Sequence, residues 1–247
     1  SALQQKNNPY ILYATSNLGS FCGLLSYPLL VEPFFDLAVQ LLIWQVGYGL
    51  LVLLFLLLLL KTGLWGTRSP DSGTQSGSRL PVAMAAKWFL LAASGSAMFL
   101  AVTNVVTFDL ASIPLLWILP LCLYLLSFVL TFKRRPWYPD WIRDRFPLAV
   151  AAGSLLFVML IQSYRLPLVA ILPVHFAILF LVCVVCHGEL NRSKPQDTTR
   201  LADFYILLSL GGFTGTVLLS WITPLLSDTV LEYGVALLLS ATALSLQ

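Results

Sequence analysis

The sequence predicts an all-α protein that crosses a lipid bilayer about eight times. Of the 247 residues, 58% are hydrophobic and only 10% are charged, whereas a soluble globular domain carries about 25% charged residues. A spanning helix needs about 20 mostly apolar residues, and its backbone must satisfy its own hydrogen bonds in hydrocarbon. The predicted spans are residues 9–31, 37–60, 88–107, 113–132, 147–162, 167–186, 204–222 and 229–246.

The first predicted span carries small and polar residues in its middle. Gly19 and Gly23 lie four residues apart and therefore share one helix face, with Asn17 and Ser20 close to them. Small residues let helices approach closely in a bilayer, and an amide inside a span needs a partner or a polar cavity. We therefore expect this helix to pack against another helix or to line a polar pathway.

The second span follows a short polar turn that contains Glu32, and it ends in an almost unbroken series of leucines. Residues 61–83 begin with a stretch rich in Gly, Ser and Thr, which indicates a mobile cytoplasmic loop. Asp109 lies in the link before the fourth span, where a carboxylate can cap free N–H groups at the positive end of a helix. Glu32 and Asp109 are also candidates for a vestibule that attracts cations.

The later spans add one ionisable candidate and one basic loop. His175 lies in the middle of the sixth span, after Pro173. An ionisable residue there is a functional candidate, for instance as a proton relay; the alternative is a neutral imidazole that bonds across a helix interface. Segment 133–145 is basic and aromatic, which suits the membrane–water interface.

The distribution of charge predicts an orientation. With alternating sides, all but one of the 14 Lys and Arg residues fall on one face of the membrane, and only Arg165 falls on the other. The face richer in cations is the cytoplasmic one. We therefore expect a multi-pass protein of the bacterial inner (plasma) membrane with both termini in the cytoplasm.

A short motif of the first span returns in the seventh. Tyr13 and residues 17–23 are echoed at a constant offset by Tyr205 and residues 209–215, so that Gly211 and Gly215 replace Gly19 and Gly23. Two spans in the same orientation and six helices apart are typical of transporters built from parallel repeats. Eight spans cannot complete two such halves. Either helices are missing at the ends, or the repeat is local.

Cys183, Cys186 and His187 match the C-x-x-C-H pattern of covalent haem attachment. The predicted topology opposes this interpretation, because the motif falls at the cytoplasmic end of the sixth span and c-type haem is attached on the other side. The alternative is two small core cysteines followed by a polar loop that begins at His187. The sequence has no nucleophile–base pair, no phosphate-binding glycine loop and no paired carboxylates, so we expect no self-contained enzyme.

Several stretches carry a family resemblance that covers almost the whole chain in order. They are residues 8–20, 27–33 (Tyr-Pro-Leu-Leu-Val-Glu-Pro), Asp109 with 114–125, 186–190 (Cys-His-Gly-Glu-Leu) and 204–212. They resemble the membrane domain of the bacterial fused major-facilitator/spermidine-synthase-like family. The resemblance implies a polytopic domain that many members join to a cytoplasmic aminopropyltransferase-like domain. No strand–helix alternation follows the eighth span, so no synthase activity is expected of this chain, which is either a membrane-only relative or one segment of a longer protein.

These observations lead to three functional hypotheses. The first is a non-catalytic membrane domain that acts as a scaffold or carries a small cationic amine past Asn17, Ser20 and His175. Such a carrier needs a polar cavity between the first and seventh spans, and Asn17→Leu should abolish its uptake. The second is an accessory structural subunit that contacts partner subunits through its glycine faces. The third and weakest is a haem-bearing electron-transfer subunit. We expect no cofactor, metal or nucleic-acid partner.

Overall fold

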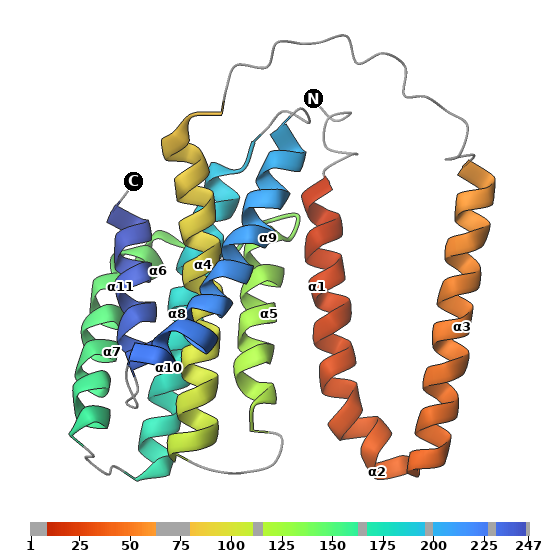
Figure 1. Cartoon of the computed structure of the whole chain (residues 1–247), viewed down its shortest axis with the longest axis horizontal. Helices are drawn as coiled ribbons and strands as arrows, with labels where there is room; N and C mark the ends of the chain where they lie inside the picture. Colours follow the sequence, from red (N-terminus) through yellow and green to blue (C-terminus); the bar gives the residue numbers. More distant parts are fainter. Residues whose placement is uncertain are drawn as a thin grey trace. The chain divides into compact units, whose positions relative to one another are not determined.

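The computed structural model describes residues 9–62, 80–110, 116–162, 167–195, 200–226 and 231–245, and all the regular structure in these ranges is helical. The chain divides into two compact units. One comprises Ser1–Leu24 and Leu80–Gln247, and the other comprises Leu25–Arg79. Figure 1 shows the helices of both units.

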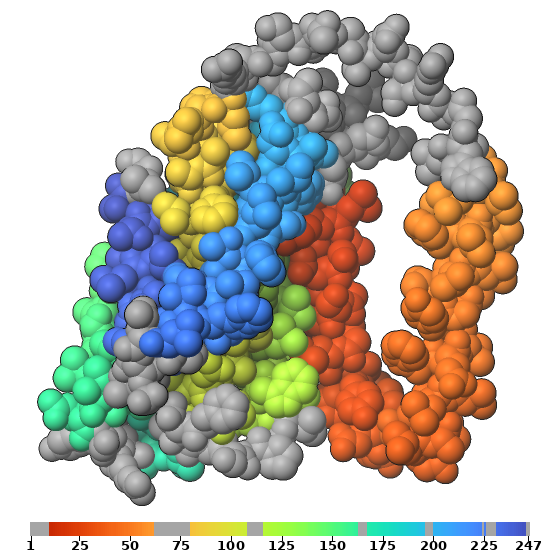
Figure 2. All heavy atoms as spheres, in the orientation of Figure 1, coloured from red at the N-terminus to blue at the C-terminus, as the bar shows by residue number. Residues whose placement is uncertain are grey.

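The smaller unit consists of η2 (Tyr27–Val31), α2 (Glu32–Phe34) and α3 (Leu37–Thr62). Phe35 takes an extended conformation that ends α2, and the Asp36 carboxylate accepts the N–H of Val39 at 3.0 Å, which caps the start of α3. The chain therefore turns at Phe35 and Asp36, whereas Glu32, the start of the predicted polar turn, lies in the short helix α2. No side chain described in this unit is buried. In Figure 2 the side chains of α3, in orange, stand out along the length of the helix.

The larger unit is a helical bundle with α4 and α8 at its centre. Helix α4 packs against α8, α9 and α11, and α8 also packs against α5 and α7. Figure 1 shows α4, in yellow, in the middle of this bundle. Its elements are α1 (Pro9–Ser26, of which residues up to Leu24 belong here), α4 (Val82–Asn104), η3 (Val105–Leu110), α5 (Ile118–Phe132), α6 (Asp140–Asp144), α7 (Phe146–Ile161), α8 (Leu168–Ser193), α9 (Leu201–Val217), η5 (Leu218–Ile222), α10 (Thr223–Leu226) and α11 (Leu231–Ser245).

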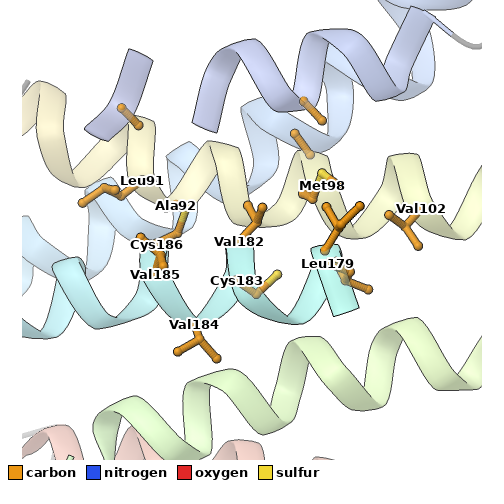
Figure 3. Close-up of a cluster of buried hydrophobic side chains, with 14 of the residues drawn as sticks. Leu91, Ala92, Met98, Val102, Leu179, Val182, Cys183, Val184, Val185 and Cys186 are labelled. Carbon is orange, nitrogen blue, oxygen red and sulfur yellow. The ribbon is translucent and has the colours of Figure 1, made fainter. Parts of the chain in front are cut away.

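The core of the bundle lies where α4 and α8 meet. Met98 and Val102 on α4 and Leu179 and Val182 on α8 are completely buried. Figure 3 shows these side chains at the contact between the two helices, whereas Val184 of α8 points towards α5. Burial of α8 on several sides explains its almost continuous apolar sequence, because a helix that is hydrophobic all round belongs in a core or a membrane.

Each of the eight predicted spans overlaps a helix, but several boundaries differ, two of them in polar segments. Helix α4 begins at Val82, so the end of the predicted loop 61–83 is helical, while residues 63–79 lie outside the described part. Helix α8 continues to Ser193 instead of ending at residue 186. The polar residues of this last stretch find partners within the bundle, so their polarity does not mark a loop. The first residues of the predicted fourth span, 113–115, lie outside the described residues.

Five helices of the described chain are long and apolar enough to span a membrane. They are Leu37–Lys61, Val82–Thr107, Asp140–Ile161, Leu168–Ser193 and Leu201–Ile222, while Ile118–Phe132 and Leu231–Ser245 are apolar but shorter. The segment 9–31 is helical but is not among these five. Its Thr15, Ser16 and Asn17 lower its apolar character. The predicted all-α class is therefore confirmed, together with several helices of membrane length.

The two predicted glycine faces have different surroundings. A Cβ atom at Gly211 would lie 2.3 Å from the carbonyl oxygen of Phe89, and one at Gly215 would lie 2.3 Å from that of Ala93. These glycines therefore allow the backbones of α9 and α4 to touch. A Cβ atom at Gly19 or Gly23 would meet no atom within 4 Å. Two similar stretches of sequence thus pack differently, and the parallel repeat stays a prediction.

Candidate functional site

A small cavity of about 170 Å³ lies among α1, α4, α5 and α9 in the larger unit. Ligand pockets for drug-sized molecules are about 300–1,000 Å³, so this cavity suits only a small ligand or one end of a longer one. It is placed between the first and seventh predicted spans, where a carrier would need it. Its lining residues are Tyr13, Ala92, Ser96, Tyr124, Phe128, Leu208, Ser209 and Gly212.

Large and small side chains together account for this hollow. The ring of Tyr13 on α1 lies 5.2 Å from that of Phe128 on α5 and 5.7 Å from that of Tyr205 on α9. Rings of this size hold α1 away from its neighbours. On the opposite wall, a Cβ atom at Gly212 would lie only 3.1 Å from the Ser96 hydroxyl, so α9 and α4 stay close. The space left between these contacts is the cavity.

The wall of the cavity offers hydroxyl groups and aromatic faces. The Ser96 and Tyr124 hydroxyls lie 3.2 Å apart and share a hydrogen bond, and Ser209 adds a third hydroxyl. Tyr13 and Phe128 contribute aromatic rings, a type of group that attracts cations. Asp, Glu, Lys and Arg are absent from the described lining. The site can therefore accept hydrogen bonds and hold a small cation or a neutral polar group, without a fixed charge.

His187 lies behind two of the rings that line the cavity. Its imidazole stacks on Phe128 with ring centroids 3.5 Å apart and meets Tyr124 edge-on at 5.2 Å. Its Nδ1 lies 2.7 Å from the Ser127 hydroxyl, which donates to the Tyr124 carbonyl at 2.6 Å. Because the Ser127 hydroxyl proton is used in that bond, the Ser127 oxygen can only accept from His187, so the Nδ1 atom of His187 carries the proton and donates it. Nε2 then carries a lone pair, has no hydrogen-bond partner in the described chain, and faces Gly95, where a Cβ atom would approach to 2.9 Å.

The haem-like motif is packed inside the bundle. Cys183 and Cys186 are completely buried, and the Cys183 thiol points at the Gly95 carbonyl oxygen, 3.8 Å away. Covalent haem needs both thiols beside an open cleft, so this packing opposes haem attachment. The interpretation of the cysteines as small core residues agrees with the structure. The expectation that His187 begins a polar loop was wrong, because it is a buried helical residue.

His175 is buried away from the lining of the cavity. Its Nδ1 lies 2.9 Å from the Ile171 carbonyl oxygen in its own helix, and its ring meets Tyr233 of α11 edge-on at 5.5 Å. Nε2 of His175 and the hydroxyl of Tyr233 both lack a hydrogen-bond partner among the described residues. The imidazole therefore forms a hydrogen bond with the backbone of its own helix. Among the described residues it forms no hydrogen bond across a helix interface, which was the alternative.

None of the other predicted pathway residues lines the cavity. The Asn17 side chain donates to the Tyr13 carbonyl at 2.8 Å, within its own helix, and Ser20 is exposed. Glu32 is exposed in the smaller unit. Asp109 lies in η3, and its side chain is outside the described part. On this helix Tyr13, one turn before Asn17, is the residue that lines the cavity.

The predicted repeat indicated the residues that line the cavity better than the side-chain amide of Asn17 did. Tyr13, Ser209 and Gly212 all belong to the echoed stretches, and the equivalent residues Tyr13 and Tyr205 lie against each other. Ser96 and Tyr124 had no comparable signal in the sequence, because single hydroxyl residues in apolar helices are common. Only the fold brings them to the same place.

A second cluster of polar residues surrounds Glu189, near the end of α8. This side chain is only 5% exposed, and its carboxylate accepts the Tyr138 hydroxyl at 3.0 Å and Nη1 of Arg192 at 3.4 Å. Arg143 Nε lies 3.7 Å away and Lys87 Nζ 3.9 Å away. One buried carboxylate thus gathers cations from α4, α6 and α8, and it fixes the basic segment to the bundle.

The residues around Tyr138 complete this cluster. A Cβ atom at Gly188 would lie 2.5 Å from the Tyr138 ring, so only glycine leaves room for it. The Arg192 guanidinium lies 4.4 Å above the same ring and pairs with Asp140 at 2.8 Å. Burial, followed by the charge of Glu189, raises the pKa of Tyr138. Tyr138 therefore remains a hydrogen-bond donor well above neutral pH.

Together these features define a class: an all-helical protein with several helices of membrane length, a small hydroxyl- and ring-lined cavity, and a buried ion cluster at one end of its central helices. Comparison of the chain with known protein families, with curated proteins and with solved structures found no match.

Proposed function

We propose that this chain is a non-catalytic, multi-pass domain of the bacterial inner membrane that carries a small amine cation through the cavity beside Tyr13. The observation that supports this most directly is the position of the cavity between the first and seventh predicted spans. The amine as substrate class is suggested by the resemblance to the fused major-facilitator/spermidine-synthase-like family. The orientation, with both termini in the cytoplasm, is the one that the charge distribution predicts.

The chemistry of the cavity suits an ammonium group. The hydroxyl oxygens of Ser96, Tyr124 and Ser209 can accept its N–H groups, and the ring faces of Tyr13 and Phe128 attract its charge. A cation–π contact contributes about 0.5–2 kcal/mol, depending on desolvation. Without a carboxylate in the described lining, binding is expected to be weak. Weak binding allows the amine to be released quickly, and a carrier depends more on rapid release than on high affinity for its substrate.

Uptake into proteoliposomes tests the proposal. The purified full chain is reconstituted, and uptake of radiolabelled 1,4-diaminobutane is measured over time and concentration. We expect saturable uptake that falls about fivefold or more in Tyr124→Phe and Ser96→Ala, because each removes a hydroxyl worth about 1 kcal/mol. Ser154→Ala is the matched control, since Ser154 is exposed on α7. Absence of saturable uptake by the wild type, or equal uptake by all variants, would refute carriage through this cavity.

A second function, that of an accessory structural subunit, is favoured by the smaller unit. Helix α3 has no buried residue in its own unit, and its exposed side chains include the stacked pair Trp44 and Tyr48, with ring centroids 5.6 Å apart. Such a helix presents a large apolar surface to lipid or to a partner. Purification from native membranes in mild detergent separates the two functions, because a subunit should elute with a stoichiometric partner and a carrier should elute alone.

A further inference from the structure

An apolar groove runs along the contact between α7 and α8, on a different part of the bundle from the amine cavity. It encloses about 340 Å³. The small side chains of Ala152 and Ala177 leave the space, and the buried side chains of Ala149 and Ile178 form its floor. The residues that line it are all apolar except Arg145, which lies at the start of α7.

We propose that this groove binds one acyl chain of an anionic phospholipid whose phosphate contacts Arg145. The inference requires the membrane location proposed above, but it does not depend on amine transport. The proposed lipid site lies on the surface of the bundle, with a charged residue at one end and apolar residues along the rest of its length.

The dimensions of the groove fit a single acyl chain. From Leu181 to Pro173 the groove follows α8 for eight residues, or about 12 Å at 1.5 Å per residue. This is most of the depth of one leaflet, which is about half of a 30 Å hydrocarbon core. The volume divided by this length gives a mean cross-section of about 28 Å². A single extended hydrocarbon chain is much thinner than a helix, which is about 10 Å across.

The charged end of the groove fits a phosphate at the membrane surface. The Arg145 guanidinium lies 5.3 Å above the Trp141 ring and donates from Nη1 to the Trp141 carbonyl at 3.3 Å. These contacts orient the group and leave its other N–H groups for a ligand. No ion pair involves Arg145 among the described residues. Arginine matches phosphate oxygens in a bidentate manner, and tryptophan favours the membrane interface.

The surroundings select an anionic headgroup over a zwitterionic one. Arg145 directly precedes α7, at the end of the helix where the dipole favours negative charge. Lys133, Arg134 and Arg135 are exposed on the segment between α5 and α6, and such basic segments attract anionic lipid. A choline group would bring a positive charge towards these cations. We therefore expect phosphatidylglycerol to bind more tightly than phosphatidylcholine.

Native mass spectrometry of the delipidated full chain in detergent tests the site. Phosphatidylglycerol, phosphatidylcholine and inorganic phosphate are titrated separately. We expect phosphatidylglycerol to bind about tenfold more tightly than phosphatidylcholine, and Arg145→Gln to weaken it to the level of phosphatidylcholine. Arg145→Lys should retain part of the preference. The matched control Lys61→Gln removes an exposed cation of the smaller unit that does not line the groove, and it should leave binding unchanged.

Two groove-filling variants test the apolar part. Ala177→Phe, or Ala152→Leu if the first fails to fold, should weaken both lipids because the ring or branched chain occupies the acyl site. Circular dichroism confirms that the helices remain. Equal affinity for both lipids, unchanged binding in Arg145→Gln, or displacement of the lipid by inorganic phosphate would each overturn the proposal. Since no transport is measured, failure of this test leaves the amine-carrier proposal standing, and the reverse also holds.

Discussion

Replacing Glu189 by glutamine tests how the end of α8 is held. Its carboxylate accepts the Tyr138 hydroxyl at 3.0 Å and lies 3.4–3.9 Å from nitrogen atoms of Arg192, Arg143 and Lys87. Glutamine keeps the shape of the side chain and an acceptor for Tyr138, but it removes the negative charge on which these cations converge. The substitution therefore isolates the electrostatic contribution from the packing.

The magnitude follows from the exposure of each partner. Removing one partner of a fully buried ion pair costs about 3–5 kcal/mol, whereas an exposed pair contributes about 0–1 kcal/mol. Here the carboxylate is 5% exposed but its cationic partners are 20–46% exposed, so water screens them after the change. We expect the free energy of unfolding to fall by about 2 kcal/mol. For a chain of this size that corresponds to a decrease in Tm of about 4–8 °C.

Thermal unfolding in detergent at pH 7, followed by tryptophan fluorescence, measures the effect. Glu32→Gln is the matched control, because Glu32 is exposed in the smaller unit. Its Tm should stay within about 1 °C of the wild type, as expected for a surface substitution. Adding Tyr138→Phe to each background gives the coupling between Glu189 and Tyr138. A Tm for Glu189→Gln equal to that of the control would show that the cluster contributes no stability and that Glu189 does not hold the end of α8.

Contacts in the larger unit lead to three further predictions. Gly215→Ala should destabilise the protein by about 1–3 kcal/mol, because the new Cβ atom would overpack against α4. Gly19→Ala should raise Tm slightly, because its Cβ atom would meet no neighbour and alanine is the better helix former. Thermal unfolding of both variants measures the difference. Since the pKa of Tyr138 is raised, the folded state favours its neutral form. Stability from this group is complete below pH 10, the ordinary pKa of tyrosine, and declines as the pH rises from there through the raised pKa of the folded state. Difference absorbance at 295 nm between wild type and Tyr138→Phe at pH 11 should therefore show no phenolate until the protein is denatured. Asn17→Leu should change amine uptake less than twofold, because the Asn17 amide bonds the Tyr13 carbonyl rather than the cavity, and strong loss of uptake would return Asn17 to the pathway.

Much of the fold could be predicted from the sequence because hydrophobic length alone marks a helix of this kind. Each predicted span overlaps a helix, and the break before α3 lies at Phe35 and Asp36, the last two residues of the predicted turn. The end of α8 was predicted too early, because polar residues after an apolar segment indicate a loop unless their partners within the fold are known. The partners of His187 and Glu189 lie 60 and 51 residues away in the chain, at Ser127 and Tyr138. Such distant pairs have no local signature.

The candidate site was predicted less well than the fold, for a related reason. An amide and an imidazole inside apolar helices draw attention because burial of a polar group is costly. In this structure Asn17 and His175 relieve that cost locally, through carbonyl oxygens four residues earlier in the same helix. The cavity is lined instead by hydroxyls and rings from four helices. No single one of these residues is unusual in its own helix.

The Cys-His-Gly-Glu-Leu stretch shows how a sequence that resembles a cofactor motif can serve the architecture. His187 holds α5 through Ser127 and supports two rings of the cavity wall. The next residue, Gly188, makes room for Tyr138, and Glu189 then binds the Tyr138 hydroxyl. Three consecutive residues therefore connect the cavity wall to the basic segment at the end of the bundle. A displacement of α5 relative to α8 would alter the contact between His187 and Ser127, so this stretch couples the wall of the cavity to the basic end of the bundle.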